Sequence, residues 1–215
     1  QLSKGSYPED SINCIIMAPT RELAQQIDQQ MEGFSYFMPA SSVAVYGGND
    51  GIRFEQEKRG LTLGADVVIA TPGRLISHLS LGYVDLSRVS FFILDEADRM
   101  LDMGFIPDVR RIVAQLPGKG VRQTMLFSAT LEPEIMRLAQ SFLHEPVMVE
   151  TEPEQVVGET IEQTFYSVAG SEKLAMLLYI IKHEPFERMI IFGNRKDKNL
   201  DVFEALQKCG IAVEL

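Results

Sequence analysis

Short apolar runs recur along the chain as far as residue 149, and a stretch with helical periodicity follows most of them. Several runs carry polar residues only at their ends, which is typical of strands buried on both faces of a parallel sheet. The strand-like runs occupy residues 13–18, 42–46, 66–70, 89–94, 123–127 and 146–149, and the helix-like stretches occupy 21–37, 74–81, 106–115 and 133–143. This alternation predicts a doubly wound α/β fold with a parallel sheet flanked by helices.

A second alternation begins after an acidic, proline-containing stretch at residues 150–155, which indicates a linker. Strands are predicted over residues 161–168, 189–192 and 211–215, and helices over 172–183 and 198–208. We therefore expect a first domain over residues 1–151, a linker over 152–160 and the beginning of a second domain over 161–215.

The bulk composition is that of a globular protein with a substantial core. The chain has 215 residues, of which 46% are hydrophobic and 23% charged. No apolar run reaches about 18 residues, so we expect no membrane span, and residues 1–5 lack the apolar core of a secretion signal. Cys14 and Cys209 lie far apart without metal-binding spacing, which favours reduced thiols in a cytoplasmic protein.

The charge balance is acidic: 20 Lys and Arg against 30 Asp and Glu leave a net charge of −10. Proteins that bind nucleic acids through bulk charge are usually basic, so the balance argues against that mode of binding. The acidic balance does not exclude a local binding site for the phosphates of a nucleic acid, built from helix N-termini and a few arginines.

Two carboxylates, Asp95 and Glu96, directly follow the apolar run that ends at residue 94. A buried strand that ends this way presents acid groups at the carboxyl edge of its sheet, where open α/β folds bind ligands. In phosphoryl-transfer enzymes an Asp there holds Mg²⁺, and a Glu can orient a water molecule for attack. The alternative is an ordinary acidic turn between a strand and a helix. The cluster of Met100, Met103 and Phe105 that follows is interpreted as core.

Pro19, Thr20 and Arg21 stand between the first apolar run and a helix-like stretch. The free N–H groups in the first turn of a helix attract phosphate, and the helix dipole adds roughly 0.3–1 kcal/mol. Arg21 adds a positively charged guanidinium group at this position. The alternative is an ordinary helix start, for which Pro and Thr are common signals.

The junction at residues 71–74 repeats this design after another apolar run. Thr71 can cap a helix, Pro72 suits the first helical position, and Gly73 lets a ligand approach the backbone closely. Arg74 supplies a second guanidinium group. Two such junctions can hold successive phosphates of one polynucleotide strand.

Two shorter motifs also end apolar runs. Gly47 and Gly48 expose backbone that can touch a sugar-phosphate chain, although a plain turn is an equally good interpretation. Ser128 and Thr130 carry hydroxyls that can hydrogen-bond a nearby carboxylate such as that of Asp98, and they can also cap the helix predicted from residue 133.

Taken together and in this order, these motifs resemble those of the DEAD-box family of ATP-dependent RNA helicases. The matching segments are 19–24, 47–48, 71–74, 95–98, 128–130 and, more weakly, 190–192. The resemblance implies a RecA-like domain, a linker and the start of a second RecA-like domain. In the family, ATP binding closes the two domains on single-stranded RNA and bends it, so that short duplexes are opened locally.

The resemblance also implies roles for individual residues, with ATP and Mg²⁺ as cofactors. Asp95 would hold Mg²⁺ through water, and Glu96 would orient and deprotonate the attacking water. Asp98, Ser128 and Thr130 would couple the nucleotide site to domain closure. The RNA backbone would be contacted by Pro19, Thr20, Arg21, Gly47, Gly48, Thr71, Pro72, Gly73 and Arg74. Because sugar and phosphate carry no sequence information, we expect sequence-independent RNA binding.

Several family segments are missing from the 215 residues. No Gly-x-x-x-x-Gly-Lys-Ser/Thr loop occurs to cradle phosphates, and residues 118–120 lack the required spacing. The adenine-reading glutamine segment and the arginine-finger segment are also absent. We therefore expect a truncated piece of a longer protein that does not hydrolyse ATP by itself, has marginal stability and exposes apolar sheet surface.

Two alternatives to a helicase piece remain. One is a naturally shortened, non-catalytic RNA-binding or adaptor protein. The other is an unrelated P-loop ATPase that acts on DNA, which Asp98 together with residues 128–130 and both Thr/Arg junctions disfavours.

Overall fold

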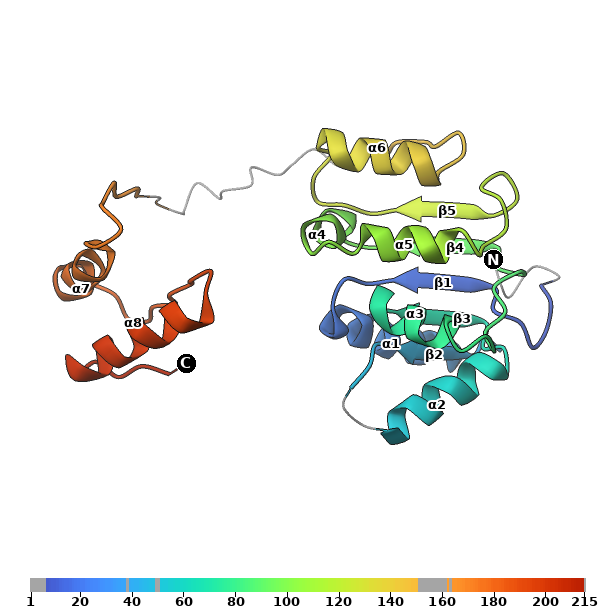
Figure 1. Cartoon of the computed structure of the whole chain (residues 1–215), viewed down its shortest axis with the longest axis horizontal. Helices are drawn as coiled ribbons and strands as arrows, with labels where there is room; N and C mark the ends of the chain where they lie inside the picture. The colour runs from blue at the N-terminus through green and yellow to red at the C-terminus, as the bar shows by residue number, and fades with distance from the viewer. Residues whose placement is uncertain (1–6, 38, 49–50, 151–161, 163, 215) are drawn as a thin grey trace. The chain divides into compact units, whose positions relative to one another are not determined.

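The computed structural model divides the chain into two compact units, Gln1–Val149 and Glu150–Leu215. It describes residues 7–37, 39–48, 51–150, 162 and 164–214 (Figure 1). The predicted linker at 152–160 therefore lies outside the described residues. Among the helices of the described ranges, none has the length and apolar character needed to cross a membrane.

The first unit is built on one parallel sheet of five strands in the order β2-β3-β1-β4-β5 (Figure 1). Its strands are β1 (Cys14–Met17), β2 (Ser42–Val45), β3 (Val67–Ala70), β4 (Phe91–Leu94) and β5 (Gln123–Leu126). Each lies within one of the predicted apolar runs, so the prediction of a parallel α/β sheet is confirmed for these five. Since every pairing is parallel, all five strands end at the same edge of the sheet.

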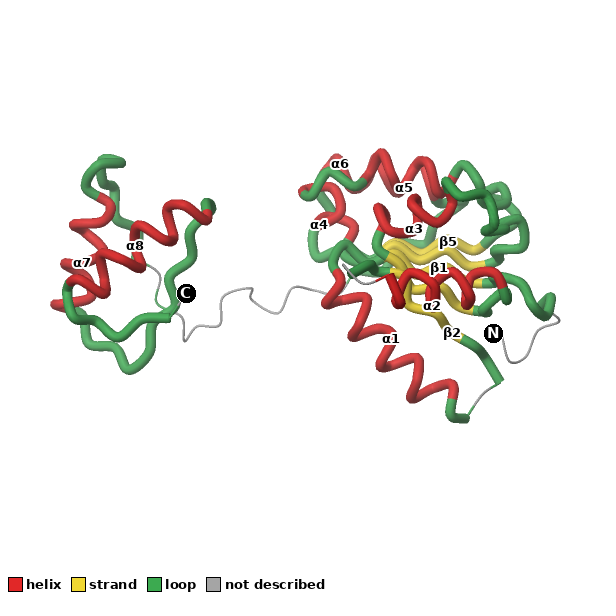
Figure 2. The backbone as a smooth tube through the Cα atoms, turned by 60° about the horizontal axis from the view of Figure 1, so that its bottom comes forward, coloured by secondary structure: helices red, strands yellow, loops and turns green. Residues whose placement is uncertain are grey.

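Helices cover both faces of this sheet (Figure 2). They are α1 (Arg21–Ser35), α2 (Gly51–Thr62), α3 (Pro72–Leu79), α4 (Ala97–Asp102), α5 (Ile106–Val113) and α6 (Pro133–Phe142). The predicted helices at 21–37, 74–81, 106–115 and 133–143 correspond to α1, α3, α5 and α6, with ends that differ by up to two residues.

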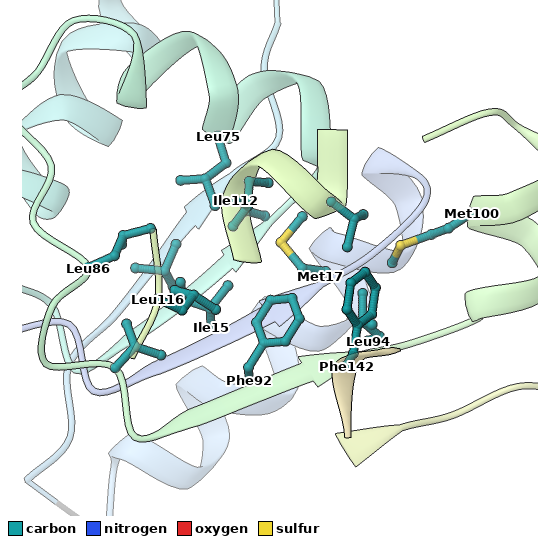
Figure 3. Close-up of a cluster of buried hydrophobic side chains, with 14 of the residues drawn as sticks. Ile15, Met17, Leu75, Leu86, Phe92, Leu94, Met100, Ile112, Leu116 and Phe142 are labelled. Atoms are coloured by element: carbon teal, nitrogen blue, oxygen red, sulfur yellow. The ribbon is translucent and has the colours of Figure 1, made fainter. Parts of the chain in front are cut away.

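The larger hydrophobic core lies on the sheet face covered by α3, α5 and α6 (Figure 3). Met17 of β1 and Phe92 of β4 point into it, where they meet Leu75 of α3 and Ile112 of α5. Each of these side chains is fully buried, and burying one such side chain contributes about 1.5–3 kcal/mol. The opposite face packs against α1 through a smaller cluster that includes Ala24.

Two helices of the first unit were not predicted. Helix α2 buries only Glu57 and Leu61, so its core-facing side lacks the apolar stripe on which a helix prediction depends. Helix α4 has six residues, which is too short for a periodic pattern. The predicted strand at 146–149 is wrong: this segment joins no sheet, and Val147 and Val149 are 88% and 85% exposed.

In the described part of the second unit, residues 150, 162 and 164–214, there are two helices, α7 (Lys173–His183) and α8 (Lys196–Lys208), which confirm the helices predicted there. Its predicted strands at 161–168, 189–192 and 211–215 are wrong for the residues that the structure describes, since none of these has strand structure. A strand forms only where a neighbour takes up its backbone hydrogen bonds. Instead, Ile190 and Phe192 are 79% and 91% exposed. That this unit begins a second RecA-like domain stays a prediction.

Candidate functional site

The parallel register brings the predicted site segments to one edge of the sheet. Met17, the last residue of β1, aligns with Ala70 of β3 and with Leu94 of β4. Leu94 in turn aligns with Leu126 of β5. Because each motif begins within two residues of such a strand end, both Thr/Arg junctions, the acidic turn and residues 128–130 lie along the same carboxyl edge.

The acidic turn is anchored to both neighbouring strands. Asp95 N–H donates to Met17 O at 3.0 Å, and Ala97 N–H donates to Phe127 O at 2.9 Å. Between them Glu96 has a left-handed backbone with φ of 47°, which is unfavourable by roughly 1–2 kcal/mol for a residue other than glycine. Such strain concentrates at functional sites. Here the left-handed conformation of Glu96 turns the chain from β4 into α4.

Asp95 is half-buried in this turn. Burial raises the pKa of its carboxyl above the usual value; the charge of Glu96 adds to the rise, and the hydrogen bond from Glu96 N–H at 3.0 Å opposes it. A buried carboxylate of this kind is stabilised by a nearby cation. Among the described residues no three His, Cys, Asp or Glu side chains gather as a metal site. One carboxylate fits Mg²⁺, which usually keeps several waters and binds substrate phosphates.

Asp98 ties the acidic turn to the end of β5. Its Oδ2 accepts hydrogen bonds from Ala129 N–H at 3.1 Å, from Thr130 N–H at 3.1 Å and from the Thr130 hydroxyl at 3.3 Å. Burial alone would raise the pKa of Asp98, but hydrogen bonds from Arg99 N–H, Ser128 and Thr130 outweigh it and hold the pKa below its usual value. The predicted contact between this carboxylate and the hydroxyl motif is therefore confirmed.

The same hydroxyls do not cap the following helix. Helix α6 has Glu132 at its N-cap position and no side-chain capping hydrogen bond. Of the two interpretations of residues 128–130, the structure supports the contact with Asp98.

The two Thr/Arg junctions differ in how their helices begin. Thr20 caps α1, since its Oγ1 accepts the Leu23 N–H at 3.2 Å. Thr71 occupies the corresponding position before α3 but makes no capping hydrogen bond. Pro72 stands in the first turn of α3, as predicted. The Thr71 side chain therefore accepts no hydrogen bond from the backbone N–H groups in the first turn of α3, and these donors stay available to a ligand.

A groove with a volume of about 640 Å³ runs between these junctions. The predicted residues that line it are Pro19, Thr20, Arg21, Gly47, Gly48, Thr71, Gly73 and Arg74. Pro72, also predicted to contact RNA, is buried instead. The acidic residues Asp95, Glu96 and Asp98 are not among those that line the groove, and they lie further along the carboxyl edge at β4.

The family model of the DEAD/DEAH box helicases matches residues 2–138 of the chain. The chain belongs to the DEAD/DEAH box helicase family. It is 43% identical over 199 residues to the ATP-dependent RNA helicase RhlB of Pseudomonas aeruginosa, an alignment that covers 92% of this chain and 49% of RhlB. The ATP-dependent RNA helicase DeaD of Escherichia coli is 42% identical over 197 residues, or 91% of this chain and 30% of DeaD.

A solved structure shows the same fold. The crystal structure of a DEAD box protein from the hyperthermophile Methanococcus jannaschii superimposes with a TM-score of 0.63 at 31% identity, covering 99% of this chain and 56% of that one. The predicted RecA-like parallel sheet flanked by helices is thereby confirmed. The chain spans about half the length of the RhlB relatives that it matches.

Five further residues of this DEAD-box chain line the groove: Glu22, Tyr46, Ser77, Met103 and Phe105. The sequence pattern predicts Met103 as core, but its side chain is exposed, whereas Met100, one turn earlier, is fully buried. Both fall in an apolar cluster, where composition alone does not distinguish a core residue from one that lines a groove.

The two arginines of the groove are held differently. Arg21 is exposed. Arg74 donates from Nε to Glu57 Oε2 at 2.6 Å and lies over the Phe54 ring at 4.7 Å, with its side chain only 18% exposed. No sequence motif pointed to Glu57, since it stands in the helix that the hydrophobic pattern missed.

Proposed function

We propose that this chain is the part of an ATP-dependent RNA helicase that grips one RNA strand and carries the acidic residues of the nucleotide site. The observation that carries the proposal is the shared carboxyl edge. The groove between the two Thr/Arg junctions and the turn at Asp95 and Glu96 lie at the ends of strands in one parallel sheet. Membership of the DEAD/DEAH box family and the similarity to RhlB and DeaD support this function.

The RNA would lie in the groove with its sugar-phosphate backbone against the protein. Gly48 and Gly73 leave room for a backbone to approach: among the residues that the structure describes, a Cβ on Gly73 would meet no atom within 4 Å, and one on Gly48 would meet only the Arg53 side chain. Arg21 supplies exposed positive charge, and the first turn of α3 supplies backbone N–H groups. Contacts of this kind do not read bases, so binding is independent of sequence.

At the acidic turn, Asp95 would hold Mg²⁺ through water, and Glu96 would orient and deprotonate the water that attacks the terminal phosphate of ATP. When bound, Mg²⁺ supplies the positive charge that offsets the charge of the phosphates. Asp98 would link this turn to Ser128 and Thr130, so that a change at β4 reaches the end of β5. A cytoplasmic location stays a prediction.

The chain contains no Gly-x-x-x-x-Gly-Lys-Ser/Thr sequence. We therefore expect the 215-residue chain to hydrolyse ATP no faster than background. RNA-stimulated ATP turnover by this polypeptide would contradict that expectation.

RNA binding by the groove is tested by fluorescence anisotropy with a labelled single-stranded RNA. We expect Arg21→Ala to weaken binding about fivefold and to reduce the salt dependence by about one phosphate contact. Arg110→Ala is the matched control, because Arg110 is an exposed arginine of α5 that does not line the groove. Equal losses in the two variants would contradict binding in the groove.

A further inference from the structure

Glu57 is a buried carboxylate on which several donors converge. It lies on α2 and is 2% exposed. Its Oε1 accepts the Gly47 N–H at 3.2 Å, and its Oε2 accepts Arg74 Nε at 2.6 Å. His78 Nε2 lies 2.9 Å from Oε2, and Arg53 Nε lies 3.8 Å from Oε1. These partners come from the loop after β2, from α3 and from α2 itself.

Burying a carboxylate is costly unless its partners compensate for the lost water. An apolar residue such as Leu61, one turn further along α2, fills a core position without that cost. The carboxylate at position 57 therefore calls for a role beyond filling space. Gly47 and Arg74, the two groups that it joins through separate oxygens, both line the groove.

The contact with Glu57 sets the position of the Arg74 guanidinium beside the groove. Nε is occupied by the carboxylate, and the guanidinium lies over the Phe54 ring at 4.7 Å. Within the described part of the chain, the buried Arg74 Nη2 has no hydrogen-bond partner. A buried donor without an acceptor is unfavourable, and a turn of the guanidinium toward the groove would let Nη2 donate a charge-assisted hydrogen bond to a phosphate oxygen.

The loop that carries Gly47 is held by the same side chain. Gly47 has φ of 79°, a conformation that favours glycine. A Cβ added there would lie 3.5 Å from Arg74 Cδ, so the arginine side chain passes close to the loop. Behind the carboxylate, His78 stacks on Phe54 at 4.3 Å between ring centroids, and its Nδ1 contacts the Tyr83 hydroxyl.

We propose that Glu57 is a positioning residue for RNA binding. Its two oxygens hold the Gly47 N–H and Arg74 Nε together, so that the Arg74 guanidinium stays at the groove, where it can turn toward a phosphate of the RNA backbone. This inference rests on the proposed function of the groove, and it assigns to α2 a part in binding although Glu57 does not itself line the groove.

The test compares charge-removing variants at two positions of α2 by anisotropy with a single-stranded RNA. Glu57→Met fills the space and removes both acceptors, and Glu57→Gln keeps one carbonyl oxygen. Glu55→Met and Glu55→Gln are the matched controls, because Glu55 is an exposed carboxylate two residues away. We expect about tenfold weaker binding for Glu57→Met, about threefold for Glu57→Gln, and changes under about twofold for the controls.

The sign of the change separates positioning from bulk charge. Each substitution removes one negative charge from a chain of net charge −10, so electrostatic repulsion alone predicts tighter RNA binding for all four variants. Weaker binding only at position 57 supports the proposal. Binding by Glu57→Met and Glu57→Gln that equals or exceeds that of the Glu55 variants would overturn it.

A double-mutant cycle tests whether Glu57 acts through Arg74. In an Arg74→Ala background, we expect Glu57→Met to change RNA affinity by less than about twofold. An unchanged tenfold effect in that background would overturn the proposal. Melting curves establish that each variant is folded, and if Glu57→Met does not fold, Glu57→Gln is carried through the same cycle.

The cycle also distinguishes this proposal from the proposed function. If Arg74→Ala binds RNA as tightly as the unmodified chain, the role of Glu57 through Arg74 is overturned; if Arg21→Ala also binds as tightly, the groove is not the RNA site and both ideas fail. If Arg74→Ala weakens binding but neither Glu57 variant does, only the role of Glu57 is overturned.

Discussion

The Asp98 carboxylate holds Thr130 by two hydrogen bonds, accepting its backbone N–H at 3.1 Å and its hydroxyl at 3.3 Å through the same Oδ2. The two residues are 32 positions apart in the chain. Their contact joins the helix that follows β4 to the segment that follows β5. We propose that this contact would carry a rearrangement at the acidic turn to residues 128–130.

Loss of the Asp98 charge is expected to destabilise the first unit in a pH-dependent way. Hydrogen bonds hold the pKa of Asp98 below its usual value, so the ionised form favours folding. That contribution is fully present above the unfolded pKa of about 3.9 and is lost as the pH falls through the lower folded pKa. Asp98→Asn should therefore lower stability by about 1 kcal/mol at pH 7 and have little effect near pH 2.

Thermal melts of the two proteins at both pH values measure this difference. Asp102→Asn is the control, since Asp102 is an exposed carboxylate at the other end of α4. A loss for Asp98→Asn that is the same at both pH values would contradict the assignment.

The two N-cap threonines are expected to differ in their effect on stability. Thr20 makes a capping hydrogen bond to Leu23 N–H, and Thr71 makes none before α3. Thr20→Ala should therefore lower the free energy of unfolding by about 1 kcal/mol, whereas Thr71→Ala should cost only a few tenths. Urea unfolding curves provide the comparison, and equal losses would be inconsistent with the observed caps.

Alanine substitutions at two glycines of the groove are expected to have different effects, one on stability through backbone strain and the other on RNA binding. Gly47 has φ of 79°, whereas a Cβ on Gly73 would meet no atom of the described residues within 4 Å. Gly47→Ala should cost roughly 1–2 kcal/mol of stability. Gly73→Ala should leave the protein stable or slightly more so, because alanine favours the helix, and should weaken RNA binding by placing a methyl group in the groove.

Melting temperature and RNA anisotropy measured on the same two preparations distinguish these outcomes. If Gly73→Ala binds RNA normally, the first turn of α3 does not touch the RNA backbone. If Gly47→Ala is as stable as the unmodified chain, the loop after β2 relaxes without strain.

The sheet could be predicted because its strands are continuous apolar runs. Met17 and Phe92 each lie within a stretch of at least four consecutive apolar residues, 14–18 and 91–94, and parallel strands of this kind bring all the following motifs to one edge. The pairing of Asp98 with residues 128–130 followed from that arrangement, since the two motifs end neighbouring strands.

The contact of Glu57 with Arg74 at the groove could not be predicted from periodicity. Glu57 occupies a core-facing position of α2 that the pattern expects to be apolar, so neither the helix nor its contact with Arg74 was found. The opposite error concerns Val147 and Ile190, which have strand-like spacing but pair with no strand among the residues that the structure describes. Periodicity indicates which residues can be buried, and tertiary pairing decides whether they are.

The most direct test of RNA binding at the carboxyl edge is the amide NMR spectrum of the ¹⁵N-labelled chain during titration with a single-stranded RNA. The account predicts shifts concentrated at the Gly48, Thr71 and Gly73 amides, with the amides of α6 unchanged. Shifts centred on α6, or none at the groove under conditions where anisotropy shows binding, would contradict it.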